Sequence, residues 1–212
     1  MNRMKFKKLA FENRLSKENF EKSAKIMDED TFIFCLEAVD DIGSETNSET
    51  LINLKKLALG QGINSIYKSC DSIEGLEESL NQLLYNDHNF KSYEIIYLIV
   101  KGEGDNICIA DYYYSLQEIA ELFEGKMTGK IVHFANEKVL DLSAEEAQYF
   151  LDVTGARAIS GYGSDFNTIT SSNLDRIFFS LFADNDNVTA IVEELFERQY
   201  ALCKMLDFRL YH

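Results

Sequence analysis

The segment that most constrains the fold is residues 93–100, YEIIYLIV, which is apolar on both faces of an extended chain. A strand buried on both faces is typical of a parallel sheet covered by helices on its two sides. Further apolar segments at residues 31–38, 63–68, 130–135 and 156–161 alternate with helical segments. This alternation predicts a mostly parallel sheet between two helical layers. We therefore expect an α/β fold, a three-layer sandwich around a sheet of about five strands.

Signals at helix ends support this order of elements. The sequences Ser115-Leu-Gln-Glu118 and Ser143-Ala-Glu-Glu146 are capping boxes, and they predict helices that end near Phe123 and Thr154. The other expected elements are a short accessory strand at 106–111, helices at 49–59, 72–85, 172–182 and 186–206, and one or two N-terminal helices within 4–27.

The length of 212 residues fits one domain, or one domain with appendages, and the complete absence of proline argues against a Pro-rich spacer between two domains. We expect an N-terminal helical extension in residues 1–30. The α/β domain is expected in residues 31–183, and a C-terminal helix packed on it in residues 184–212.

Charge and hydropathy exclude several classes of partner. The formal net charge of −15 argues against DNA or RNA, because neutralising phosphates requires a basic face. The basic residues 1–27 are expected to pack on the acidic body. No membrane partner is expected, because the longest apolar stretch, residues 95–100, is far too short to span a bilayer. Without a signal-peptide pattern, the expected location is the cytoplasm.

The cysteines and histidines have no spacing typical of a metal site. Cys35, Cys70, Cys108 and Cys203 form no CxxC pair, and the three histidines have no ligand spacing with them. No metal and no cofactor is expected. Buried free thiols in a reducing compartment are the expected state of the cysteines. His133 lies in an apolar strand and is expected to be a core histidine with a backbone partner.

In a parallel sheet, ligands bind outside the carboxyl ends of the strands. Three strand exits carry polar residues: LIVKGEGD at residues 98–105, VHFANEK at residues 132–138, and AISGYGSD at residues 158–165. The order of a strand with His-Gly, an accessory strand, a helix, and a strand with Cys is that of the caspase-like (clan CD) cysteine peptidases. Over about residues 31–183, the chain resembles an uncharacterised bacterial family with a caspase-like fold.

The chain departs from this pattern at both catalytic positions. Lys101 precedes Gly102 where the pattern has the His of His-Gly, and Glu137 stands where it has the Cys. Covalent catalysis of this type needs a thiolate and an imidazole that activates it, and neither is present. The resemblance therefore implies a pseudo-peptidase, in which Lys101 and Glu137 occupy vestigial catalytic positions. The two side chains are expected to form an ion pair across the former cleft, and the alternative is that both point into water.

Residues beside these positions are candidates for lining the same cleft: Gly102, Asn136, Tyr162 and Asp165. The sequence Gly161-Tyr162-Gly163-Ser164 is first of all typical of a turn, in which Tyr162 could form the wall of a pocket. The glycines of residues 102–104 do not open a helix with G-x-G-x-x-G spacing, so they do not predict a dinucleotide site.

Three functional hypotheses remain. The first is a catalytically inactive binding or interaction module, whose expected partner is another protein or a second copy of the chain. The second is an enzyme of another class that uses Lys101, Glu137, Tyr162 and Asp165. The third is a flavodoxin-like ligand-binding regulatory domain. A strand edge filled by side chains favours the first, whereas an open pocket with convergent polar groups favours the second.

Overall fold

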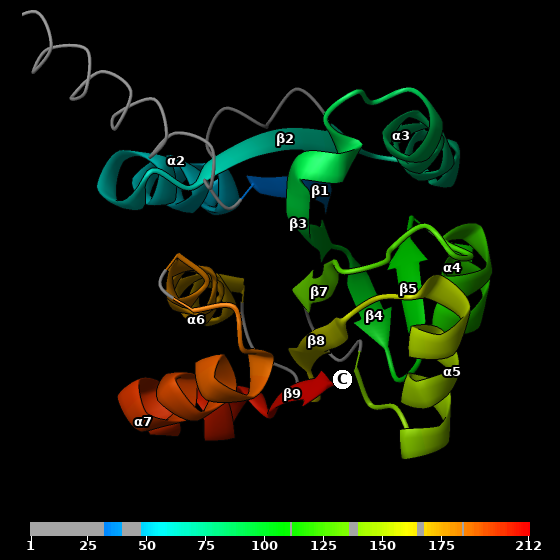
Figure 1. Ribbon diagram of the computed structural model, residues 1–212. Helices are drawn as coiled ribbons and strands as arrows, with labels where there is room; N and C mark the ends of the chain where they lie inside the picture. Colours follow the sequence, from blue (N-terminus) through cyan, green and yellow to red (C-terminus); the bar gives the residue numbers. More distant parts are fainter. Residues whose placement is uncertain (1–31, 40–47, 111, 136–139, 165–167, 184) are drawn as a thin grey trace, which may run out of the picture. The chain divides into compact units, whose positions relative to one another are not determined.

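The computed structural model describes residues 32–39, 48–110, 112–135, 140–164, 168–183 and 185–212 (Figure 1). The chain divides into two compact units, Met1–Asp30 and Thr31–His212. The first unit lies outside the described residues, and so do the helices expected within residues 4–27 and their packing on the body. All described residues belong to the second unit.

The larger of two sheets has the strand order β2-β1-β3-β7-β8-β9. Its first five strands are parallel to one another, and the last is antiparallel to β8. The strands are β1 (Phe32–Ala38), β2 (Asn64–Cys70), β3 (Tyr93–Ile99), β7 (Ile131–Ala135), β8 (Ala158–Tyr162) and β9 (Phe208–Tyr211). The expectation of an α/β fold with a mostly parallel sheet flanked by helices is confirmed, with one strand more than expected.

A smaller antiparallel sheet follows β3 directly. It has the order β4-β5-β6 and consists of β4 (Lys101–Glu103), β5 (Asn106–Ile109) and β6 (Tyr112–Ser115). The accessory strand expected at residues 106–111 is its middle strand. The segments on either side of it were not predicted as strands, because each has only three or four residues.

Helices cover both faces of the larger sheet (Figure 1). On one face, α3 (Ile73–Tyr85), α4 (Leu116–Leu122) and α5 (Ala144–Thr154) pack on residues such as Phe34, Leu98 and Phe134. On the other, α2 (Glu49–Gln61), α6 (Thr168–Leu181) and α7 (Val188–Leu206) pack on residues such as Ile33, Ile95 and Ile131. A short 3₁₀ helix, Phe90–Ser92, precedes β3.

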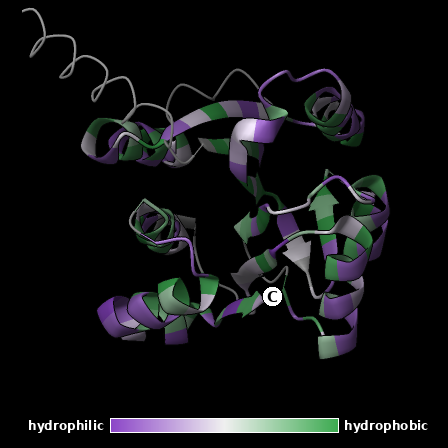
Figure 2. Ribbon diagram, viewed as in Figure 1, coloured by the Kyte–Doolittle hydropathy of each residue, from purple (hydrophilic) through white to green (hydrophobic). Residues whose placement is uncertain are grey.

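Local sequence explains why these helices begin where they do. Ser115 and Ser143 each accept a hydrogen bond from the backbone of the glutamate three residues later, and that glutamate bonds back to the serine N–H, which confirms both capping boxes. Figure 2 shows helices banded in green and purple, the pattern of an amphipathic helix with one buried face. The strands of the sheet are therefore held between two apolar layers.

Residues 184–212 form more than the helix expected there. After α7 the chain turns at Asp207, which has a φ of 49°, and β9 then pairs with β8. The C-terminal residues are therefore part of the sheet and not only a helix packed against it. Four residues after a long helix carry no separate strand signal, so β9 was missed.

Candidate functional site

The exits of β3 and β7 lie side by side at the carboxyl edge of the sheet. The two strands are parallel neighbours, and Ile99 of β3 pairs with Ala135 of β7. Lys101, which is exposed, and Gly102 follow β3 and pair with Cys108 and Ile107 of β5. Three predicted site residues, Asn136, Glu137 and Asp165, lie outside the described residues, so the ion pair between Lys101 and Glu137 stays a prediction.

Tyr162 lies in the core rather than in an open cleft. It is 1% exposed and faces α6 from β8, where its hydroxyl donates a hydrogen bond to Oδ1 of Asp175. Oδ1 of Asp175 also lies 2.9 Å from Nε2 of His133, and Oδ2 accepts from the hydroxyl of Tyr97 at 2.7 Å and from that of Ser171 at 3.4 Å. The buried Asp175 carboxylate is thus surrounded by four groups with which it can form hydrogen bonds, and we call these five residues and Ser160 the Asp175 cluster.

The tyrosines of the Asp175 cluster stay protonated. Burial and the adjacent Asp175 carboxylate raise the pKa of both the Tyr97 and the Tyr162 phenol well above the usual range. A phenol that keeps its proton can donate to a carboxylate, as both do here. The Asp175 side chain is therefore held by contacts from four elements, β3, β7, β8 and α6.

His133 is buried as expected, but its partners are side chains and not the backbone. Nδ1 lies 2.8 Å from Oγ of Ser160, and Nε2 faces Asp175. Serine, histidine and aspartate in a row resemble a catalytic triad, which is identified by geometry and roles. Here Ser160 and His133 are both 0% exposed and Ser160 lies inside β8, so a substrate cannot reach the hydroxyl. The arrangement acts as a polar support for the core.

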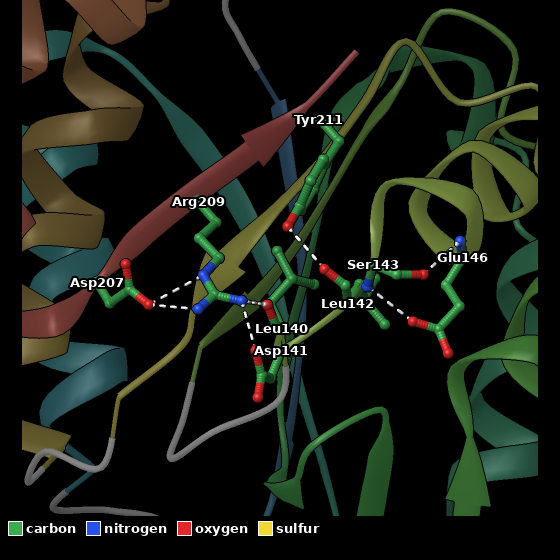
Figure 3. A network of polar contacts seen from close by, with 8 residues as sticks. All are labelled: Leu140, Asp141, Leu142, Ser143, Glu146, Asp207, Arg209 and Tyr211. Atoms are coloured by element: carbon green, nitrogen blue, oxygen red, sulfur yellow. Dashed lines mark hydrogen bonds and ion pairs between the residues drawn. The ribbon is translucent and has the colours of Figure 1, made fainter.

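Side chains of described residues pack at the carboxyl edge above β7 and β8, as Figure 3 shows in part. Leu140 is 0% exposed, and its N–H donates to the carbonyl of Tyr162. Arg209 of β9 donates from Nη1 to the Leu140 carbonyl and to Asp141, and from Nε and Nη2 to Asp207. We call this set of contacts around Arg209 the Arg209 clamp. It fixes the residues that return from the β7 exit.

Two glycines permit this close packing. A Cβ on Gly161 would lie 2.8 Å from the Phe134 carbonyl oxygen, and one on Gly163 would lie 2.3 Å from Oδ2 of Asp207. Gly161 and Tyr162 lie within β8 and neither glycine has a positive φ, so the turn predicted for residues 161–164 is wrong at its first two residues. The glycines are needed for space and not for backbone conformation.

None of the four thiols is paired with an imidazole in the described structure. Cys35, Cys70 and Cys203 are buried, and burial raises the pKa of all three, to about 11 for Cys70 and Cys203. Cys108 is half-buried and donates to the carbonyl of Ala110. A thiol with a raised pKa is a poor nucleophile near neutral pH.

An open pocket of about 240 Å³ lies beside this edge, between the first turns of α4 and α5. The helix α4 leads to the start of β7, and α5 leads from its end, so both helices begin at the carboxyl edge. Neither Gly102 nor Tyr162 lines this α4–α5 pocket. Its lining consists of apolar, acidic and neutral polar residues: Leu116, Leu142, Tyr149, Phe150, Asp105, Glu145, Glu146, Ser115 and Gln117.

The sequence did not reveal the Asp175 cluster, the Arg209 clamp or the pocket. Asp175 and Arg209 lie in a helix and a short strand, and most of their partners are far away in the sequence. The two capping boxes were the only local signal near the pocket, because they place the starts of α4 and α5. Among the described residues, no group of side chains could hold a metal ion, and no helix is long and apolar enough to cross a membrane.

Comparison with known proteins gives a family without an assigned role. Residues 30–212 match the model of a family described as "Family of unknown function (DUF6642)". No curated protein matches the chain.

Proposed function

Because this chain belongs to DUF6642, a family of unknown function, over nearly all its length, we propose its role from the site alone: it is a non-catalytic binding module with a caspase-like fold. The observation that carries the proposal is the state of the thiols and of His133. Three thiols are buried with raised pKa values, and His133 is bonded to Ser160 and Asp175. A covalent peptidase mechanism needs both groups free and facing each other.

Two features support the caspase-like part of the proposal. The accessory sheet β4-β5-β6 and the helix α4 lie between β3 and β7, and an accessory strand and a helix at this place are part of the order on which the resemblance rests. The exits of β3 and β7 are neighbours, as the His and Cys positions of the caspase-like pattern would be. Among the described residues, Leu140 and Arg209 pack on the edge above β7 and β8, which favours a binding module over an enzyme that uses the same cleft.

The strand order also fits a second candidate, a flavodoxin-like ligand-binding domain. The parallel strands run β2-β1-β3-β7-β8, which is the flavodoxin-like order, whose ligand binds at the crevice between β1 and β3. Glu37 lies at the end of β1, and its carboxylate accepts hydrogen bonds from Ser48, Thr50 and Tyr67. A carboxylate there repels a phosphate group, so this candidate ranks second. Titration with flavin mononucleotide tests it, and saturable binding would favour it.

The first test of the proposed function asks whether the protein has peptidase activity or a reactive serine. A fluorogenic peptide panel, a thiol-reactive probe with turnover, and a fluorophosphonate probe for reactive serines should all give no signal above a heat-denatured control. Turnover that is lost on alkylation of a single cysteine would overturn the proposal. Fluorophosphonate labelling of Ser160 would show that the Asp175 cluster opens to substrates, and it would also overturn the proposal.

The second test asks whether positions 101 and 137 face each other. Glu137→Cys introduces a thiol, and Lys101→His adds an imidazole opposite to it. A facing imidazolium lowers the pKa of the thiol, so we expect iodoacetamide to label the introduced thiol about tenfold faster in the double variant than in Glu137→Cys alone. Mass spectrometry separates this label from one on Cys108. Equal rates would remove the caspase-like assignment of the two positions.

A further inference from the structure

The floor of the α4–α5 pocket is apolar. Leu116, Leu142 and Phe150 are 3%, 7% and 1% exposed, and they form the inner wall. Tyr149, which is 39% exposed, lies at the side. The volume of the α4–α5 pocket, about 240 Å³, is below the range of roughly 300–1,000 Å³ that is usual for the sites of drug-sized ligands. A pocket of this size suits one long side chain and not a cofactor.

The rim of the pocket is acidic. Asp105, Glu145 and Glu146 line it, and its lining residues include no Lys, Arg or His. Hydrogen bonds from the backbone N–H and the hydroxyl of Ser143 lower the pKa of Glu146, which is therefore ionised at neutral pH. Asp105 accepts a hydrogen bond from the side-chain amide of Asn106, which is the other described contact between these three acids and a polar side chain. Oxygen atoms remain at the rim to accept hydrogen bonds from a cation.

An anionic ligand does not fit the same place. The N-terminus of a helix attracts anions through its free N–H groups. In α4 and α5 two of these N–H groups each, those of Ser115 and Glu118 and of Ser143 and Glu146, are already bonded within the capping boxes. The carboxylates of Glu118 and Glu146 lie beside them and would repel a phosphate.

We propose that the α4–α5 pocket receives an arginine side chain presented by a peptide or protein partner. The methylene groups of arginine pack on the apolar floor while the charged head stays at the acidic rim, as long basic side chains do at surfaces. The planar guanidinium can donate to two carboxylates at once, which a lysine ammonium does less well. The net charge of −15 steers a basic partner toward the molecule. This inference names the ligand of the binding module proposed above and rests on that proposal.

The test uses the full chain and blocked tripeptides of alanine with a central arginine, lysine or glutamine. We expect the arginine peptide to shift the backbone amide signals of residues 115–117 and 142–150 in NMR titrations. The glutamine peptide should bind at least about tenfold more weakly, which corresponds to 1.4 kcal/mol. Agmatine carries the same guanidinium without a peptide and is expected to bind more weakly than the arginine peptide.

Variants locate the binding. Glu145→Gln removes a rim charge without touching a capping box, and we expect it to weaken the arginine peptide about fivefold or more. Glu193→Gln, on the exposed face of α7, removes the same charge from the opposite face of the sheet and should leave the affinity unchanged. Thermal melts confirm that both variants are folded.

Several results would overturn the inference: equal shifts with the glutamine peptide, shifts confined to other residues, equal effects of the two variants, or agmatine binding as tightly as the peptide. None of these results bears on peptidase activity, because that activity is measured with separate probes. Conversely, peptidase turnover would overturn the proposed function whatever occupies the pocket.

Discussion

At the scale of single residues, Asp175 is expected to have a large effect on stability. It is 2% exposed, and it receives hydrogen bonds from Tyr97 and Tyr162 and faces His133. Asp175→Ala leaves the buried hydroxyls of Tyr97 and Tyr162 without their acceptor, and each unsatisfied buried donor costs about 1–3 kcal/mol. We therefore expect Asp175→Ala to lower the free energy of unfolding in urea by about 2–6 kcal/mol.

The matched control is Asp152→Ala. Asp152 is exposed on α5 and accepts one hydrogen bond from Gln148, so its loss should change stability by at most about 0.5 kcal/mol. If Asp175→Ala is as mild as its control, the Asp175 cluster does not support the core as described.

At the scale of elements, the Arg209 clamp joins β9 to the residues that return from the β7 exit. Arg209→Ala loses charge-assisted hydrogen bonds to Asp207 and Asp141 in a partly exposed place, so we expect a loss of about 1–2 kcal/mol in thermal or urea unfolding. Gly163→Ala should disrupt the contact between Arg209 and Asp207, because the new Cβ would lie 2.6 Å from Cζ of Arg209.

A double-mutant cycle of Gly163→Ala and Arg209→Ala separates a clash with the Arg209 side chain from an effect of the substitution on the backbone alone. Gly163→Ala should cost clearly less stability when Arg209 is already alanine, because the clash then has one partner fewer. Gly60→Ala is the control glycine: it lies in α2 with nothing within 4 Å of the new Cβ, and it should stabilise the protein by about 0.5–1 kcal/mol. Purely additive effects at positions 163 and 209 would refute the proposed contact.

The elements also show how much of the fold can be predicted from the sequence. The strand β3 was predicted because its residues are apolar on both faces, and α4 and α5 because capping boxes mark their first turns. The short strand β9 was missed, and Gly161 was assigned to a turn because only contact distances reveal its close approach to Phe134. Sequence patterns record local geometry, whereas the Asp175 cluster and the pocket depend on contacts between residues far apart in the chain.

At the scale of the whole molecule, the buried thiols predict a loss of stability at alkaline pH. Burial raises the pKa of Cys70 and Cys203 to about 11 in the folded protein, whereas an unfolded thiol titrates near about 8.5. Above about pH 8.5 the unfolded chain loses protons that the folded chain keeps, so the contribution of these thiols is complete below that pH and falls as the pH rises toward about 11.

Urea unfolding at a series of pH values from about 8 to about 10 measures this slope. In Cys203→Ala the slope should be shallower, because one of the groups that titrate differently in the two states is gone. A stability that is flat over this interval, or a slope unchanged in Cys203→Ala, would contradict the prediction.

The position of β7 has a consequence for hydrogen exchange. This strand lies between two parallel neighbours, and its residues are 0–2% exposed, so solvent deuterium reaches its amides when the sheet itself opens. Transient opening at β9 or at the first turns of α4 and α5 leaves β7 unlabelled. The slowest-exchanging amides of β7 therefore report global unfolding, while faster exchange elsewhere reports which part of the molecule opens alone.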